Sequence, residues 1–337
     1  MNVTIRDVAK KSGYSITTVS RALNGFDDVS EETRAKIIAV AKELNYQPNR
    51  VARSLVSKTV NTIGLFVLGR SSFQQGFIAD LVSGLIDEAS THDFDLLIFG
   101  TQSLKTGLPF TQLCRQRGVG GAVITGLKIT DPILAELEAS DFPTVLIDVP
   151  IKGPKATYVS FDNQEGISQA ITHLCDLGHR KIGFINGHME AWVCHERLAG
   201  YKKGLAKHGL VFNEAYVYNG DFTKESGRAG AKELIEKNPE LTAILVASDL
   251  MAAGALEELT ALGYTLPDDI SLVGFDDQTF AALTSPALTT IKQDEYLLGR
   301  LAAENIIKLI NDPNYQPEVK SLTTRLVVRQ STGPVKS

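Results

Sequence analysis

Three side chains near the N-terminus, Ile16, Thr17 and Arg21, are of types that suit contact with the edges of DNA base pairs. The guanidinium group of an arginine can donate two hydrogen bonds to O6 and N7 of guanine, and the methyl groups of isoleucine and threonine can contact the thymine methyl group. Hydroxyl groups near a helix start suit phosphate oxygens, which position a protein but carry no sequence information. The hydroxyl side chains that adjoin these three residues are Ser15, Thr18 and Ser20.

The stretch from residue 4 to residue 24 has the pattern of two short helices joined by a tight turn. Thr4 and Asp7 have the capping-box spacing that marks the start of the first helix. Gly13 suits the turn, because glycine adopts backbone conformations that a Cβ atom disfavours. Ser15 is a typical N-cap residue for the second helix. The pattern therefore predicts a helix-turn-helix, whose second helix lies in the DNA major groove.

Charge is divided unevenly along the chain, which holds 34 Lys and Arg and 39 Asp and Glu. Residues 1–60 carry a net charge of +4, and the remainder carries −9. If this uneven distribution of charge is left aside, the N-terminal pattern also fits a small three-helix domain with solvated Ser and Thr side chains. A basic head on an acidic body favours the first interpretation, because only the head then meets phosphate. A third helix is predicted from Ser30, with a buried face at i, i+3, i+4 and i+7 formed by Ile37, Val40, Ala41 and Leu44.

From residue 61 onward, short apolar runs alternate with longer amphipathic segments, which predicts an α/β fold with parallel sheets. The first series consists of strands at 62–68, 94–100, 121–126 and 144–149 with a helix at 77–90. The second consists of helices at 164–177, 192–208 and 249–262 with strands at 181–187, 242–248 and 271–276. Two such series suggest two similar subdomains. Open α/β folds bind ligands beyond the carboxyl ends of their strands, so we expect a binding cleft between the two sheets.

Side chains that suit a sugar lie at the ends of these predicted strands or at the starts of the helices. Proteins hold sugars with carboxylates and with Arg or Asn donors, and place an aromatic ring against the apolar face of the sugar. Taken singly, each candidate also suits a helix cap or a surface position. The candidates are Asp162, Arg197, Phe222, Ser248, Asp249 and Asp276, with Gln75 and Phe77 from the other subdomain.

Composition excludes several classes of protein. A hydrophobic content of 43% over 337 residues is ordinary for a globular chain of two or three domains. Three scattered cysteines do not suggest a disulfide framework, and the N-terminus lacks the apolar region of a signal peptide, so we expect a cytoplasmic protein without membrane spans. No dinucleotide or phosphate-loop motif is present, and no His or Cys spacing matches a metal site. We therefore predict no enzyme activity, no cofactor and no metal.

The run VTIRDVAKKSGYSITTVSRALN, followed by VSEETRAKIIAVAKELNYQPNRVARSL, resembles the head of the lactose-repressor (LacI/GalR) family of bacterial transcription regulators. The spacing matches from Val3 to Leu55 without a gap, and the rest of the chain follows the family layout. The resemblance implies a DNA-binding head at 1–45, a hinge-helix connector at 46–60 and a periplasmic-binding-protein-like body at 61–337. It also implies interleaved subdomains, with the N-subdomain at about 61–161 and 292–322 and the C-subdomain at about 162–291 and 323–333.

The resemblance assigns base reading to positions 16, 17 and 21. It also implies that Leu55, with the same residue of a second chain, wedges into the minor groove and bends the duplex. That requires a homodimer on a palindromic operator. A helix at 48–56 is too short to be stable alone, so it should form only when DNA or a partner holds it. The other predicted DNA contacts are Thr4, Asn24, Tyr46, Asn49 and Ala52.

The resemblance places each sugar-binding candidate on an effector-contact position. This sequence departs from the family pattern at Ser248, where the family commonly has Asn. The identity of the sugar bound by a family member therefore does not carry over to this protein. We predict a repressor of sugar-utilisation genes that is switched by a small sugar. A purine or nucleoside effector is the alternative within this family. A two-lobed solute-binding protein is the alternative from another class, but it would need export and would have no basic head.

Overall fold

The computed structural model describes residues 3–24, 26–46, 60–69, 76–104, 107–317 and 319–336. The chain divides into two compact units, Met1–Asn61 and Thr62–Ser337, which we call the head and the body. The predicted connector helix at 48–56 lies outside the described residues.

The head is a three-helix unit made of α1 (Ile5–Ser12), α2 (Ile16–Leu23) and α3 (Glu31–Glu43). Gly13 ends α1 in the left-handed conformation, with φ of 77°, as the predicted turn requires. Ser15 caps α2, its hydroxyl oxygen accepting the N–H of Thr18 at 3.1 Å. Val19 and Ile37 are fully buried in the small core between the helices. The helix-turn-helix prediction is confirmed.

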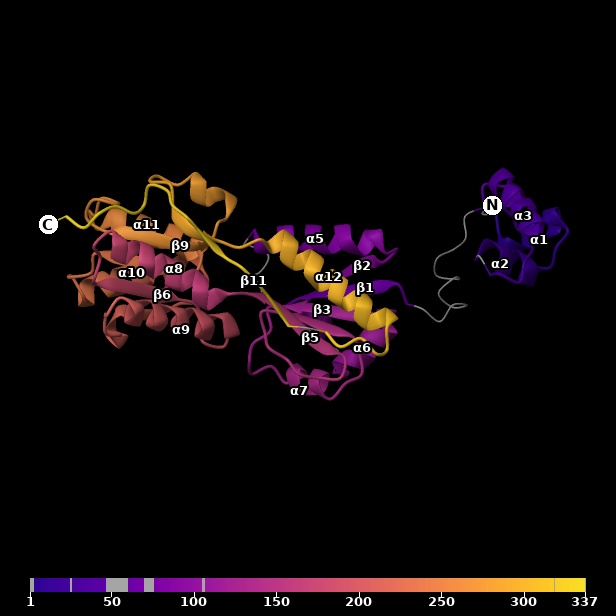
Figure 1. Ribbon diagram of the computed structural model, residues 1–337, viewed down its shortest axis with the longest axis horizontal. Coiled ribbons are helices and arrows are strands. Elements are labelled where there is room, and N and C mark those ends of the chain that lie inside the picture. The colour runs from indigo at the N-terminus through magenta and orange to yellow at the C-terminus, as the bar shows by residue number, and fades with distance from the viewer. Residues whose placement is uncertain are drawn as a thin grey trace. The chain divides into compact units, whose positions relative to one another are not determined.

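The first six-stranded sheet of the body is parallel throughout and has the strand order β11-β5-β4-β3-β1-β2. We call it and its helices the N-subdomain. Helix α12 lies against α5, although the two are more than 200 residues apart in sequence (Figure 1). The elements are β1 (Thr62–Val67), α5 (Phe77–Thr91), β2 (Asp95–Gly100), η2 (Thr101–Leu104), α6 (Phe110–Gln116), β3 (Gly121–Thr125), α7 (Ile133–Glu138), β4 (Thr144–Ile147), β5 (Ala156–Phe161), α12 (Glu295–Asn311) and β11 (Lys320–Leu322).

The second six-stranded sheet has the order β12-β10-β9-β8-β6-β7, with β12 antiparallel to β10 and the other pairs parallel. We call this part the C-subdomain. Its elements are α8 (Asn163–Asp176), β6 (Ile182–Asn186), α9 (Trp192–Lys207), η3 (Glu214–Tyr216), β7 (Val217–Asn219), α10 (Lys224–Lys237), β8 (Ala243–Val246), α11 (Asp249–Ala261), β9 (Ser271–Asp276), η4 (Thr279–Ala282), β10 (Thr289–Lys292) and β12 (Arg325–Val327).

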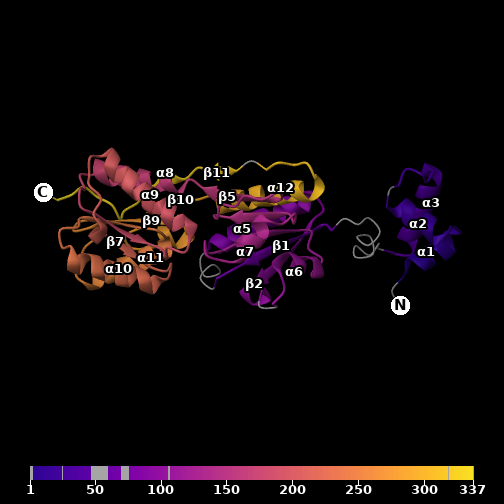
Figure 2. The ribbon, with the colours of Figure 1, turned by 90° about the horizontal axis from the view of Figure 1, so that it is seen from below.

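The described chain passes between the two subdomains at three places: from β5 to α8, from β10 to α12, and from β11 to β12. Figure 2 shows the last part of the chain (yellow) returning from α12 toward the C-subdomain. Each subdomain has its own buried apolar core around its sheet. The predicted α/β class is confirmed, and the three crossings connect two separately packed halves.

Glycines let two helix pairs approach closely. In the pair of α5 and α12, a Cβ atom on Gly84 would lie 2.0 Å from the carbonyl oxygen of Tyr296. One on Gly299 would lie 2.1 Å from the carbonyl oxygen of Leu81. Helices α10 and α11 repeat this reciprocal contact through Gly227 and Gly254, which face backbone carbonyls of the partner helix. Any side chain at these positions would push the two backbones apart.

We expect Gly299→Ala to lower the free energy of unfolding of the body by about 1 to 3 kcal/mol, despite the higher helix propensity of alanine. The clash is with the backbone of α5, which cannot yield without separating the pair. Urea unfolding of the full chain measures the change. Gly100→Ala is the control, because no atom lies within 4 Å of the added Cβ there. Equal stabilities of the two variants would contradict the role of the glycine contact.

Candidate functional site

The exposed face of α2 carries the residues predicted to read bases. Ile16 is 46% exposed although it is apolar, and Thr17 is exposed beside it. Val19 and Ala22 lie on the opposite face and are buried in the core of the head. An exposed branched aliphatic side chain at the start of a short helix, next to a threonine, is a surface that can contact thymine methyl groups.

Arg21 is held in place on the same helix. Its Nε donates to Oδ1 of Asp28 at 2.9 Å, and its Nη2 lies 2.6 Å from Oδ2 of that residue. The guanidinium group also lies over the ring of Phe26, with 4.7 Å between Cζ and the ring centroid. The side chains of both Arg21 and Asp28 remain about half exposed. The arrangement presents an ordered guanidinium fork that can exchange a carboxylate for a guanine edge.

The other predicted DNA contacts are spread around the head. Asp7 accepts hydrogen bonds from both the backbone N–H and the hydroxyl group of Thr4, and these bonds lower the pKa of Asp7. Asn24 ends α2 and donates to Ser20 at 3.3 Å. Tyr46 is half buried against the core of the head. The predicted contacts Asn49, Ala52 and Leu55 lie outside the described residues, as does Gln75 of the predicted effector site.

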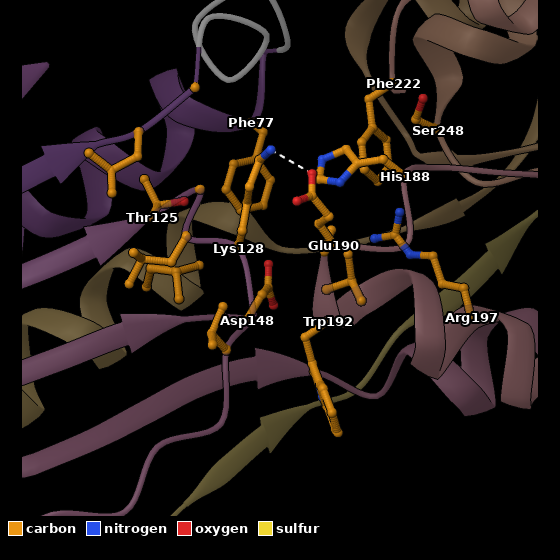
Figure 3. A pocket seen from close by; sticks show the side chains of 18 of the residues that line it. Phe77, Thr125, Lys128, Asp148, His188, Glu190, Trp192, Arg197, Phe222 and Ser248 are labelled. Atoms are coloured by element: carbon orange, nitrogen blue, oxygen red, sulfur yellow. Dashed lines mark hydrogen bonds and ion pairs between the residues drawn. The ribbon is translucent and has the colours of Figure 1, made fainter. Parts of the chain in front are cut away.

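A cavity of about 440 Å³ lies between the two subdomains. Its lining comes from the carboxyl ends of strands in both sheets and from the first turns of α5 and α9 (Figure 3). Five of the predicted effector residues line it: Phe77, Arg197, Phe222, Ser248 and Asp276. The volume is in the range of pockets that enclose small ligands.

Arg197 is the buried cation of this cavity. Its Nε donates to Oδ1 of Asn163 at 2.8 Å, and its Nη1 donates to the carbonyl oxygen of Ala247 at 2.5 Å. The guanidinium group stacks on Phe275, with 4.0 Å between Cζ and the ring centroid. The side chain is 5% exposed. These bonds fix the position of the guanidinium group and leave Nη2 without a hydrogen bond to a described residue.

Two carboxyl groups, one from each subdomain, interact with the charge of Arg197: Asp276 is buried and Asp148 is half-buried. Burial raises the pKa of Asp148, and the hydroxyl of Ser160 and the charge of Arg197 oppose the shift. Burial likewise raises the pKa of Asp276 to about 6, opposed by Arg197 and by a hydrogen bond from Gln293. Together, a guanidinium donor and two carboxylate acceptors can bind the hydroxyl groups of a ligand.

Aromatic rings line the same cavity. Phe222 has a positive φ of 66°, and its ring covers Gly187, where a Cβ atom would lie 2.3 Å from the ring. The ring of His188 meets it edge to face at 5.5 Å between centroids. Trp192 and Phe77 begin α9 and α5 at the cavity (Figure 3). These rings supply apolar surface that can cover the C–H face of a sugar.

Two predicted effector residues, Asp162 and Asp249, are not among the residues that line the cavity. The exposed carboxylate of Asp162 caps α8, accepting the N–H of Glu165 at 2.9 Å. Asp249 is fully buried, where its carboxylate accepts the hydroxyl of Thr290 at 2.6 Å and the N–H of Gln278 at 2.8 Å. Both side chains accept hydrogen bonds from protein groups at the junction of a strand and a helix.

Sequence reasoning missed several lining residues. Asp148 follows strand β4 just as Asp276 ends β9, and that parallel was a usable signal. Lys128 and Glu190 carried no signal, because their relation depends on the packing of the two subdomains. The Nζ atom of Lys128 lies 2.5 Å from Oε2 of Glu190 across the cavity, and the N–H of Ile129 donates to the carbonyl oxygen of Glu190 at 2.9 Å. These contacts join the two subdomains at the edge of the cavity.

We expect ligand affinity at this cavity to fall about tenfold between pH 7 and pH 5, because Asp276 takes up a proton near pH 6 and loses its acceptor role. Calorimetric titration across this range measures the change. The pKa of Asp276 is raised above its ordinary value of 3.8, so protonation of this group favours the folded state as the pH falls through that window. Unfolding through Asp276 therefore does not explain the loss. Asp276→Asn should bind weakly at every pH, and an unchanged inflection near pH 6 in that variant would contradict the assignment.

The described part of the chain gives no sign of metal binding or of a membrane span. No group of three or more His, Cys, Asp and Glu residues within it is placed to hold a metal ion. None of the described helices is long and apolar enough to cross a membrane.

Comparisons with known proteins agree with this division into a head and a body. Residues 4–49 match the family model for bacterial regulatory proteins of the lacI family. Residues 171–332 match the model for a periplasmic binding protein-like domain. The chain is 35% identical over 335 residues to the HTH-type transcriptional regulator CelR of Thermobifida fusca, covering 97% of this chain and 98% of that protein. It is 33% identical over 330 residues to the HTH-type transcriptional repressor PurR of Photobacterium profundum, with 97% and 98% covered.

Solved structures show the same similarity over the whole chain. The complex of the transcriptional regulator CelR with cellobiose has a TM-score of 0.76 at 32% identity, covering 98% of this chain and 100% of that chain. The Lac repressor dimer bound to operator and the anti-inducer ONPF has a TM-score of 0.82 at 30% identity, with 99% and 100% covered.

Proposed function

This chain belongs to the lacI family of bacterial regulatory proteins, and we propose that it represses sugar-utilisation genes and that a small carbohydrate in the cavity of the body switches its operator affinity. As a family member it is a DNA-binding transcriptional regulator with a ligand-binding body. The observation that carries the carbohydrate proposal is the cavity itself, where the charge of Arg197 interacts with Asp148 and Asp276 and aromatic rings are part of the lining.

This arrangement favours a sugar over a purine. The described lining offers the carboxylates of Asp148, Asp221 and Asp276 as acceptors. A polyhydroxylated ligand has many O–H donors for them, whereas a purine has few N–H donors. The similarity to CelR, whose solved structure contains cellobiose, supports the same choice. We infer that the ligand acts as an effector and is not a substrate of this protein.

We further propose that the protein acts in the cytoplasm as a homodimer on a palindromic operator. The similarity to the Lac repressor dimer bound to operator supports this assembly. Two heads related by a two-fold axis read two half-sites of opposite orientation, so protein symmetry predicts operator symmetry. Base contacts come from Ile16, Thr17 and Arg21, and the residues of the connector, including Leu55, complete the grip on the minor groove.

The proposed switch uses the crossings between the subdomains. A ligand that contacts both sheets changes the angle between them, and DNA affinity changes only as far as the ligand distinguishes the two arrangements. Coupling of this kind typically amounts to about 1 to 3 kcal/mol, or about 5- to 150-fold in operator affinity.

The test begins with selection of binding sites from random duplex DNA by the full chain. Fluorescence anisotropy on the selected duplex then gives operator affinity with and without each sugar of a panel, at several salt concentrations. We expect a palindromic site, a steep salt dependence and one sugar that changes affinity at least fivefold. The same sugar should raise the melting temperature of the protein. Selection of an asymmetric site, or a response to purines with none to sugars, would refute the proposal.

A further inference from the structure

Lys128 and Glu190, which form an ion pair, both line the cavity. Lys128 follows strand β3 of the N-subdomain, and Glu190 precedes α9 of the C-subdomain. Figure 3 shows the pair bridging the cavity between Phe77 and His188. Each side chain is about half exposed, so the pair is at the mouth, where a ligand must pass or rest.

The described lining residues include two cationic side chains, Lys128 and Arg197. Arg197 is buried, and Glu190 pairs with the other one, Lys128. The hydrogen bond with Glu190 raises the pKa of Lys128, and the same bond lowers the pKa of Glu190. Both groups therefore remain charged at neutral pH and neutralise one another. Burial lowers the pKa of His188, with Lys128 acting in the same direction, so His188 is uncharged there and adds no positive charge.

The charge of the other cation, Arg197, is already balanced by carboxyl groups of the protein. Its Nε and Nη1 each donate to a protein oxygen, so Nη2 and the second N–H of Nη1 are the donors that remain for a ligand. Asp148 and Asp276 flank it and already interact with its charge. At the rim, hydrogen bonds from Thr223 and Ser226 lower the pKa of Asp221, which keeps that carboxylate ionised.

We propose that Glu190 sets the charge class of the effector: by pairing with Lys128 it leaves the cavity without an unbalanced positive charge, so that the cavity takes uncharged sugars and rejects uronates and sugar phosphates. The proposal rests on the carbohydrate function proposed above. It makes Glu190 a specificity-determining residue, although its carboxylate serves another side chain and makes no essential ligand contact. An anionic ligand in the cavity would find no unbalanced positive charge and would lie near the carboxylates of the lining. The repulsion between these like charges would lower its affinity.

The test compares ligands of nearly the same shape and different charge. Calorimetric titration of the full chain uses D-glucose, D-glucuronamide and D-glucuronate, the corresponding galactose series, and cellobiose with its uronate. We expect the wild-type protein to bind the neutral members at least about tenfold more tightly than the anions. The Glu190→Gln substitution frees the ammonium group of Lys128. In this variant the ratio of neutral-sugar affinity to uronate affinity should fall about threefold to tenfold, and by more at low salt.

Two further variants separate this effect from a general change in the protein. In the double variant Lys128→Ala with Glu190→Gln, the gain in uronate affinity should disappear, because the freed cation is gone. Asp141→Asn removes the carboxylate of an exposed pair with Arg115, away from the cavity lining, and should keep the wild-type preference.

The outcomes distinguish the two proposals. Wild-type protein that binds uronates as tightly as the neutral sugars overturns the charge selection and leaves the carbohydrate function intact. A Glu190→Gln variant with the wild-type preference and wild-type melting temperature overturns the role of Glu190. Failure of every sugar, neutral or charged, to bind the wild-type protein overturns the proposed carbohydrate function itself.

Discussion

Arg197→Ala is expected to abolish the response to the effector, with a loss of at least about 100-fold in ligand affinity. The substitution removes a buried guanidinium group that bonds to Asn163 and to the backbone of Ala247. It also leaves Asp148 and Asp276 without the charge that lowers their pKa values, so both would be protonated at higher pH. A cavity that has lost this guanidinium group, and whose two carboxyl groups take up protons more readily, lacks the groups that hold hydroxyls.

Operator affinity without ligand separates loss of the site from loss of the fold. The head forms a compact unit of its own, so Arg197→Ala should bind operator within about threefold of wild type in anisotropy titrations. Arg197→Lys provides the matched control: it keeps the charge but not the planar fork, and should lose less affinity than alanine. Retention of the full effector response by Arg197→Ala would remove the cavity from the proposed mechanism.

Arg21→Ala is expected to lower operator affinity by about 10- to 100-fold and to relax sequence preference at one base pair of each half-site. The side chain is ordered by Asp28 and Phe26 on an exposed helix face, so little rotamer freedom is lost when it binds a guanine edge. The energy of a bidentate contact is lost with the guanidinium group, and no other described arginine lies on α2.

The measurement is anisotropy on the selected operator and on its single-base variants. Lys11→Ala is the control, because it removes the same charge from the head at a residue of α1 that pairs with Glu43. That variant should weaken binding to all sequences alike and by less, as expected for loss of a general electrostatic attraction. Equal losses across all base variants in Arg21→Ala would show that Arg21 contacts the backbone and does not read a base.

The sequence was sufficient to predict the long elements of the body. The interiors of buried parallel strands such as β1 and β9 are apolar runs, and the predicted bounds of these strands agree with the structure to within a residue or two. Edge strands β7, β11 and β12 were not predicted, since three residues are too few to show a periodicity. Their positions are set by pairing with neighbours that are distant in the sequence.

The same limit governs the candidate site. A polar residue after a strand indicates the correct edge of a sheet, which is why Arg197 and Asp276 were identified. It does not tell whether the side chain reaches the cavity or satisfies the backbone, and Asp162 and Asp249 show the second case. The pair of Lys128 and Glu190 joins residues 62 positions apart on different subdomains, so only the packed structure reveals it.

Three crossings connect the subdomains, and this number restricts the mechanics of the body. Two bodies joined by a single tether can twist, bend and slide in any direction. Bodies joined at three points can twist or slide only by stretching at least one of the connections, whereas bending about the line of the connections leaves all three nearly unchanged. Bending of one subdomain against the other is therefore the softest motion of the body, and binding energy gained in the cavity is directed into it.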